Sequence, residues 1–321
     1  MSSSGASDVA ERSPRTGESS TPLLRVICGP TGAGKTGLAH TLARQHGLTI
    51  VSADSRQLYR EFDIGTAKPS PAERVGIDYR GLDVADPAAR WSAARWAADA
   101  ERWIAECGVD RALVVGGTGL YLKALTAPLH DSPELDPTKR AELDATLQPL
   151  AIEELRRLCL ELDPPRAHLG RTQLLRSIET ARLTGRPLSA WHAESARPAP
   201  FRARWLVVDP GAHLAGQIAG RIDAMLAAGW LDEVRALMAH VPADASAWQG
   251  CGYRALRDVA EERCSLVAAR ETILIETRQY AKRQRTWFRH QLAGSDVTIV
   301  DPRDPGVHDI VEQWWSGGLQ S

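Results

Sequence analysis

Short apolar runs, separated by helix-periodic segments, are the first features of this chain. The runs are Leu23–Cys28, Leu48–Ser52, Ala112–Val115 and Trp205–Val208, and Val297–Val300 has the same character. Nearly continuous apolar runs of this length are typical of strands buried on both faces of a parallel sheet. Their alternation with helices predicts an α/β fold, in which helices flank a parallel sheet.

Apolar residues also recur at helical spacing, every three to four positions. These stripes follow Gly34, surround Trp96 and fill residues 214–225, and a long final helix is expected over about residues 266–292. In contrast, glycine and proline punctuate residues 63–69 and predict a loop.

Strands and helices no longer alternate between residues 128 and 200. Helical patterns there cover Lys139–Leu147, Ile152–Leu160 and Thr172–Leu183. We therefore expect residues 22–127 and 201–321 to form the α/β core, and residues 128–200 to form an inserted all-helical domain. Residues 1–21 are rich in serine and lack aromatic residues, which predicts a disordered tail.

The first loop of the predicted sheet fits the P-loop pattern. It reads Gly29, Pro30, Thr31, Gly32, Ala33, Gly34, Lys35 and Thr36. In this pattern the glycines let backbone N–H groups point at phosphate oxygens, the lysine adds a positive charge, and the threonine hydroxyl can hold Mg²⁺. The loop also opens a helix, whose N-terminal dipole favours an anion. The pattern predicts a site for a diphosphate or a triphosphate, within an α/β fold of the P-loop NTPase-like kind.

Two further candidate segments lie directly after predicted strands, and ligands in open α/β sheets bind at these carboxyl ends of the strands. Asp54 follows the second run, and its position leaves two roles equally open, an acid near the phosphates or the cap of a following helix. The glycines of Gly116–Tyr121 indicate backbone close to a ligand, with a plain tight turn as the alternative. The run before them ends without the acidic residue that holds Mg²⁺ in many P-loop ATPases, which weakens a hydrolase interpretation.

Composition and charge narrow the classes of function. The net charge is −1, so any nucleic-acid partner requires a local basic surface. The five cysteines contain no Cys-x-x-Cys pair, which argues against a zinc site or a disulfide framework and suits a reducing cytosol. No apolar run approaches the ~20 residues that cross a bilayer. We expect a cytoplasmic protein, monomeric and without a membrane partner.

One local basic surface is predicted on the final helix. Arg278, Lys282, Arg285 and Arg289 are spaced so that four cations follow one helical face, which we call the basic stripe. Basic faces are usually only solvated, but close cations repel each other unless an anion neutralises them. Together with a diphosphate site, the stripe favours a nucleic-acid partner bound through its phosphates, with Trp287 beneath the stripe as core.

Taken together and in this order, these segments resemble the tRNA dimethylallyltransferase family, the isopentenyl-diphosphate:tRNA transferases. The matching segments are Gly29–Thr36, Ser52–Gln57, Asp63–Pro69, Val115–Leu125, Arg176–Ser189, Gly252–Tyr253 and Lys282–Arg289. The resemblance implies transfer of a dimethylallyl group from dimethylallyl diphosphate to N6 of the adenosine beside the tRNA anticodon, with release of diphosphate. Two alternatives stay open, a P-loop small-molecule kinase and prenyl transfer to a free adenine nucleotide.

The resemblance also implies roles for single residues. The P-loop would grip the donor's diphosphate, with Lys35 and a Mg²⁺ on Thr36, and Arg221 would steady it. Asp54 would be the general base and Thr118 would contact the target nucleotide. The residues implied to contact tRNA are Asp54, Ser55, Arg56, Gln57, Thr118, Arg140, Gln173, Arg176, Gly252, Tyr253, Arg254, Lys282, Arg283, Gln284, Arg285, Trp287 and Arg289.

Overall fold

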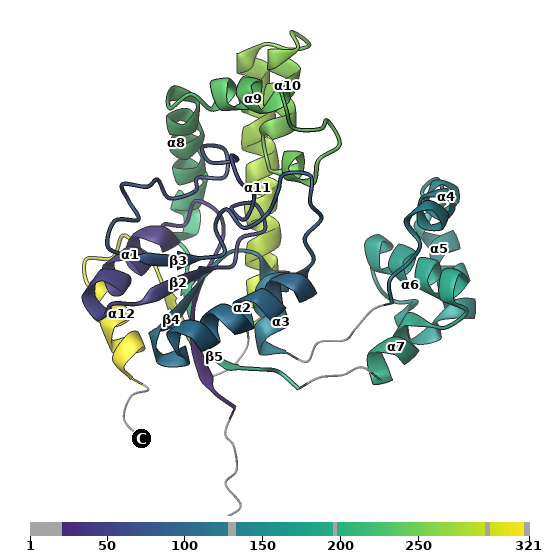
Figure 1. The fold of residues 1–321 in the computed structure, drawn as a ribbon, viewed down its shortest axis with the longest axis horizontal. Coiled ribbons are helices and arrows are strands. Elements are labelled where there is room, and N and C mark those ends of the chain that lie inside the picture. Colours follow the sequence, from purple (N-terminus) through teal and green to yellow (C-terminus); the bar gives the residue numbers. More distant parts are fainter. Residues whose placement is uncertain (1–20, 128–132, 195–197, 293–295, 318–321) are drawn as a thin grey trace, which may run out of the picture.

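The computed structural model describes residues 21–127, 133–194, 198–292 and 296–317 (Figure 1). The disordered tail expected over residues 1–21 lies almost wholly outside these ranges, so it stays a prediction.

Six parallel strands form one sheet in the order β3-β2-β4-β1-β5-β6. Their bounds are β1 Leu23–Cys28, β2 Thr49–Ser52, β3 Asp78–Arg80, β4 Ala112–Gly116, β5 Arg202–Val208 and β6 Val297–Val300. The central strand, β1, pairs with β4 on one side and with β5 on the other. All strands point the same way, so the loops that follow β1, β2 and β4 meet at one edge of the sheet. The expected P-loop NTPase-like α/β fold is confirmed.

Helices cover the sheet and extend beyond it (Figure 1). Their bounds are α1 Lys35–His46, α2 Ala93–Cys107, α3 Gly119–Thr126, α8 Leu214–Ala227, α9 Trp230–Met238, α10 Tyr253–Ala260, α11 Leu266–Gln291 and α12 Val307–Ser316. The long helix α11 contacts α3, α8 and α10, and so links the sheet to the helices above it. Position and length of this helix match the sequence-based expectation.

Four further helices stand to one side of the sheet in Figure 1. They are α4 Pro137–Leu147, α5 Ile152–Leu162, α6 Arg171–Thr184 and α7 Leu188–Glu194. Their apolar side chains form a second core, separate from that of the sheet, built from Leu147, Leu155, Cys159, Leu174, Leu175 and Ile178. We refer to these four helices as the helical insert.

Glycines allow the loops at the carboxyl edge of the sheet to approach one another. A Cβ atom on Gly29 would lie 2.2 Å from the carbonyl oxygen of Val208, and one on Gly116 would lie 2.2 Å from that of Ala53. The amide of Ala53 donates to the carbonyl of Val115 at 2.8 Å. The loop after β1 therefore lies against the end of β5, and the segments after β2 and β4 lie against each other.

Candidate active site

A cavity of about 300 Å³ opens at the carboxyl edge of the sheet. The P-loop, the segment after β2 and the segment after β4 form its base, and side chains of α8 and α11 form its walls. The structure thus brings Lys35, Thr36, Asp54 and Arg221, all singled out from the sequence, to one cavity.

The P-loop lysine lies at the base of the cavity, against its own loop. The Nζ atom of Lys35 donates to the carbonyl oxygens of Gly29 at 2.9 Å and Pro30 at 2.8 Å. Burial lowers the pKa of Lys35 to about 8, and the charge of Arg221 acts in the same direction, while Asp54 opposes them. A bound anion would stabilise this charged ammonium, so the cavity is suited to an anionic ligand.

A second cation, Arg221, reaches the cavity from α8. Burial lowers the pKa of its guanidinium, and the charge of Asp54 partly opposes this shift. Lys35 and Arg221 together face Asp54, so the cavity carries more positive than negative charge around the phosphate-binding loop. This imbalance is what a diphosphate requires.

The carboxylate of Asp54 is fixed by the turn that follows it. Its Oδ1 atom accepts hydrogen bonds from the amides of Arg56 at 2.8 Å and Gln57 at 3.4 Å. The alternative that Asp54 caps a helix is wrong, because residues 55–58 form turns and no helix begins there. These two bonds fix the orientation of the carboxylate at the cavity. Both use Oδ1, which leaves Oδ2 available to a ligand.

Thr118 lies beside Asp54 and not on the cavity wall itself. Its Oγ1 atom accepts from the amide of Ser55 at 3.0 Å, which ties the loop after β4 to the loop after β2. Tyr280, on α11, lines the cavity and lies near Thr118. Burial, and then the negative charge of Asp54, raise the pKa of Tyr280 to about 12, so the phenol keeps its proton at neutral pH.

Tyr280 is a site residue that the sequence analysis missed. Thr277, Tyr280 and Gln284 follow each other at i, i+3 and i+7 on α11, and all three line the cavity. This spacing marks a second polar face on the helix, distinct from the basic stripe. This spacing can be recognised in the sequence, but the basic stripe on the same helix is the stronger pattern.

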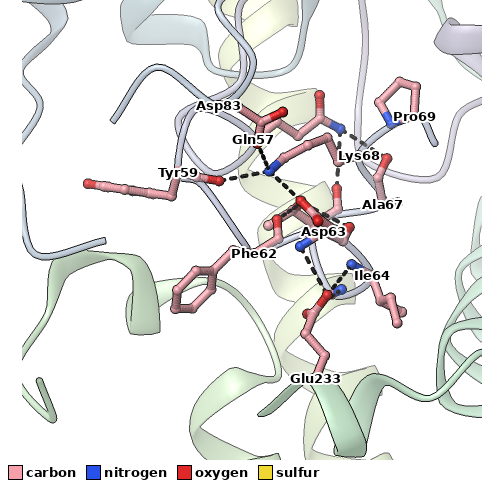
Figure 2. A network of polar contacts seen from close by, with 12 residues as sticks. Gln57, Tyr59, Phe62, Asp63, Ile64, Ala67, Lys68, Pro69, Asp83 and Glu233 are labelled. Carbon is pink, nitrogen blue, oxygen red and sulfur yellow. Dashed lines mark hydrogen bonds and ion pairs between the residues drawn. The ribbon is translucent and has the colours of Figure 1, made fainter. Parts of the chain in front are cut away.

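The predicted loop over residues 63–69 is confirmed, and a buried lysine holds it (Figure 2). The Nζ atom of Lys68 donates to the carbonyl of Tyr59 at 2.7 Å and forms ion pairs with Asp63 at 2.5 Å and Asp83 at 2.6 Å. The Lys68 side chain is fully buried, so these oxygens replace the water around its charge. The loop in turn supplies cavity-lining backbone.

Glu233 on α9 holds the same loop from the opposite side (Figure 2). Its carboxylate accepts from the amides of Asp63 at 3.0 Å, Ile64 at 2.6 Å and Gly65 at 3.3 Å. The hydroxyl of Tyr253 donates to it as well, at 2.7 Å. Because about 170 residues of chain separate Glu233 from the loop, no local pattern in the sequence could have revealed this contact.

We expect Glu233→Gln to lower the free energy of unfolding by about 2–3 kcal/mol, since hydrogen bonds to a charged group are lost and an amide N–H₂ is set against backbone N–H donors. Urea unfolding measures this. Asp232→Asn, at an exposed neighbouring carboxylate, is the matched control and should change the free energy by less than about 0.5 kcal/mol. An equal effect of both variants would show that the clamp on the loop is unimportant.

The structure corrects the expectation that Gly252 and Tyr253 present a surface to tRNA. Tyr253 is fully buried, with its ring 4.8 Å from that of Phe62 and 5.6 Å from that of Trp230. Gly252 is buried with a φ of 88°, and a Cβ there would lie 2.3 Å from the Trp230 ring. Both residues shape the wall behind the cavity. Only Arg254, next to them, is exposed.

Two expectations for the final helix also need correction. All four cations of the basic stripe were expected to be available to the phosphates of a partner, but Arg285 forms an ion pair with Asp209 and donates to the carbonyl of Gly211. Trp287 is only partly buried, and it packs where Gly119 leaves room for its ring. Arg278, Lys282 and Arg289 are exposed, so three cations of the stripe face solvent.

The remaining predicted tRNA contacts lie in two places. Arg56 and Gln57 line the cavity together with Arg283 of α11. In the helical insert, Arg140 forms an ion pair with buried Glu179 at 2.8 Å. Burial lowers the pKa of Arg176, and nearby Arg140 adds to this shift, so the two arginines lie close together. Gln173 is exposed at the start of α6, one turn before Arg176.

Within the described ranges, no group of three or more His, Cys, Asp or Glu side chains is arranged to hold a metal ion. Among the same residues, no helix is long and apolar enough to cross a membrane.

Comparison with known proteins gives one consistent result. The chain matches the IPP transferase family over residues 57–291 and the isopentenyl transferase family over residues 22–83. It is 37% identical to the tRNA dimethylallyltransferase of Deinococcus radiodurans, over 91% of this chain and 97% of that protein. The identity to the enzyme of the same name from Halorhodospira halophila is 41%, over 90% and 97% of the two chains.

Solved structures agree with the sequence comparisons. A tRNA isopentenylpyrophosphate transferase from Staphylococcus epidermidis is similar with a TM-score of 0.63 and 28% identity, over 91% of this chain and 97% of that one. A eukaryotic dimethylallyltransferase, described as acting on tRNA, has a TM-score of 0.72 and 25% identity, over 93% and 77% of the two chains.

Proposed function

Because the chain belongs to the IPP transferase family, we propose that it transfers the dimethylallyl group of dimethylallyl diphosphate to N6 of the adenosine beside the anticodon in tRNA. One observation carries this proposal. A single cavity combines a phosphate-binding loop with two cations, a fixed carboxylate and an apolar wall. These are the features that an allylic diphosphate and a weakly nucleophilic amine require.

The donor has a charged diphosphate and an apolar hydrocarbon tail, and the cavity offers a matching surface to each. Its diphosphate would lie on the amides of the P-loop between Lys35 and Arg221, and its hydrocarbon tail would lie against apolar side chains of α8 and α11. The apolar residues that line the cavity are Ile218, Ile222, Met225, Trp230 and Ile273. A nucleoside triphosphate would place polar sugar against this wall, so the geometry favours an isoprenoid diphosphate over ATP and disfavours the kinase alternative.

The diphosphate becomes a good leaving group only when its developing charge is neutralised by fixed groups. Lys35 and Arg221 would supply two such charges. Thr36 is exposed on the cavity wall, where its hydroxyl would help to hold a Mg²⁺ ion. When bound, the ion would neutralise charge on the leaving diphosphate.

The acceptor amine would attack from the side of Asp54. In this step N6 forms a bond to C1 of the dimethylallyl group, the C1–O bond breaks, and both its electrons leave with diphosphate. Oδ2 of Asp54 takes the proton that N6 loses, while Oδ1 stays bound to the turn. Thr118, which accepts from the amide of Ser55, would keep the segment that carries Asp54 in place.

Cations outside the cavity favour tRNA over a free adenine nucleotide as the acceptor. Arg278, Lys282 and Arg289 face solvent on α11, and Arg140 and Arg176 lie together on the helical insert. A mononucleotide would occupy only the cavity and would leave all five unused. A folded RNA can contact both places through its phosphates.

The choice of acceptor tests this proposal. Purified protein with labelled dimethylallyl diphosphate should label unmodified tRNA and should leave AMP and ATP unlabelled at equal concentration. Labelling of AMP instead would contradict the tRNA assignment. Phosphorylation of a small molecule by ATP, without prenyl transfer, would support the kinase alternative.

We expect Lys282→Ala combined with Arg289→Ala to weaken tRNA binding and to lower the slope of log affinity against log salt by about 2, which is about 1 for each lost phosphate contact. Salt titrations of tRNA binding measure this, with donor affinity as the internal reference. Arg235→Ala, at an exposed arginine of α9, is the matched control and should leave the slope unchanged. Parallel slopes for the wild type and the double variant would show that the stripe is only solvated.

A further inference from the structure

Gln284 of α11 is buried, and both ends of its side-chain amide bind loops of the cavity. Its Oε1 atom accepts from the amide of Thr31 at 2.8 Å, and its Nε2 atom donates to the carbonyl of Gly117 at 2.8 Å. Only 7% of the residue is exposed. The implied contact between Gln284 and tRNA is thus corrected, because the side chain is engaged inside the protein.

The two loops that Gln284 joins have different tasks in the proposed reaction. Thr31 belongs to the P-loop, which would hold the donor's diphosphate. Gly117 precedes Thr118, which is bound to Ser55 and so to the segment that carries Asp54. A Cβ atom on Gly117 would lie 2.4 Å from Nε2 of Gln284, so a glycine at this position is needed for the contact.

The helix that carries Gln284 is itself fixed at this level. One residue further along, Arg285 forms its ion pair with Asp209, after the end of β5. One turn earlier, Tyr280 lies near Thr118. Trp287 packs against Gly119 at the start of α3. These contacts hold the Gln284 side chain in place relative to the P-loop and the segment after β4.

We propose that Gln284 is a positioning residue for prenyl transfer, which holds the donor loop and the acceptor loop at a fixed separation. This inference rests on the proposed function, because it assumes that the P-loop binds the donor and that the Asp54 side binds the adenine. Transfer requires C1 of the donor and N6 of the acceptor to be aligned, and a misplacement of about 1 Å can cost on the order of 10²-fold in rate. Of these two loops, the donor would contact only the first and the adenine only the second. A change in the distance between the loops should therefore affect the chemical step more than the binding of either substrate.

Gln284→Met tests the inference, since methionine has a similar length and forms neither hydrogen bond. We expect kcat to fall by about 10–100-fold, while KM for the donor and KM for tRNA each change by less than about threefold. The matched control is Gln279→Met, an exposed glutamine on the same helix, which should leave kcat unchanged. Circular dichroism and urea unfolding establish that both variants are folded.

Two results would overturn the inference. A rise in KM for tRNA with an unchanged kcat would show that Gln284 contacts the RNA. A fall in stability, or a rise in KM for the donor, with kcat preserved would show that it only supports the P-loop. Loss of prenyl transfer in the wild type, or full activity of Lys35→Ala, would instead refute the proposed function itself, so the two failures are distinguishable.

If Gln284→Met does not fold, Gln284→Glu provides the same test through its pH profile. An ionised glutamate can accept from Thr31 but cannot donate to Gly117, whereas a protonated one restores both bonds. At saturating donor and tRNA, the ratio of its kcat to that of the wild type should rise as the pH is lowered. A ratio that does not change with pH would overturn the inference.

Discussion

Asp54→Asn should lower kcat by about 10²–10⁴-fold, the usual contribution of a positioned general base. Asparagine keeps the oxygen that accepts from the amides of Arg56 and Gln57, so the turn should remain intact. It cannot take a proton from N6. Donor affinity should therefore be nearly unchanged, and steady-state kinetics with separate donor titrations measure both quantities.

Asp99→Asn, at a carboxylate on α2 away from the cavity, is the matched control and should keep the wild-type kcat. A different pattern would assign Asp54 a different role. If Mg²⁺-dependent donor binding collapses in Asp54→Asn while kcat at saturation stays normal, Asp54 is a metal ligand and not the base.

Lys35→Ala should lower kcat/KM by at least about 10²–10³-fold, because a fixed cation at the leaving group is lost. The wild type should also bind the donor more weakly as the pH rises through about 8, where unliganded Lys35 loses its proton. The sign follows from the charge, since the ammonium attracts diphosphate and the neutral amine does not. Donor binding by Lys35→Ala should lack this transition.

Lys123→Ala, at an exposed lysine on α3, is the control for Lys35→Ala and should behave as the wild type. Calorimetric titration of the donor between pH 6.5 and 9.5, which spans the Lys35 pKa of about 8, measures the transition. If Lys35→Ala retains both tight donor binding and turnover, the diphosphate does not lie on the P-loop.

The parts of the fold that were predicted from the sequence are those with a strong local signal. The strands β1, β2, β4 and β5 are continuous apolar runs, and the P-loop has a spacing fixed by phosphate geometry. Strand β3 was missed because it has only three residues, Asp78–Arg80, at the edge of the sheet and none of them fully buried. The helices α9 and α10, of nine and eight residues, were also not predicted.

Some residues of the site could be predicted from their place in the sequence, and others could not. Lys35 ends the loop between β1 and α1, and Asp54 lies just after β2, so their place at the sheet edge could be inferred from the order of elements. Gln284 and Glu233 act through contacts with segments more than 160 residues away. Such contacts depend on tertiary packing, which is also why the burial of Tyr253 and the ion pair of Arg285 were not foreseen.

The central claim is that this cavity joins a dimethylallyl group to a tRNA adenine, and analysis of the product tests it most directly. Unmodified tRNA is incubated with the purified protein, Mg²⁺ and dimethylallyl diphosphate, then digested, and its nucleosides and anticodon fragments are analysed by mass spectrometry. The account predicts one dimethylallyl group on N6 of the adenosine beside the anticodon, with one diphosphate released for each group transferred. Unmodified adenosine at that position, or a prenyl group elsewhere in the RNA, would contradict it.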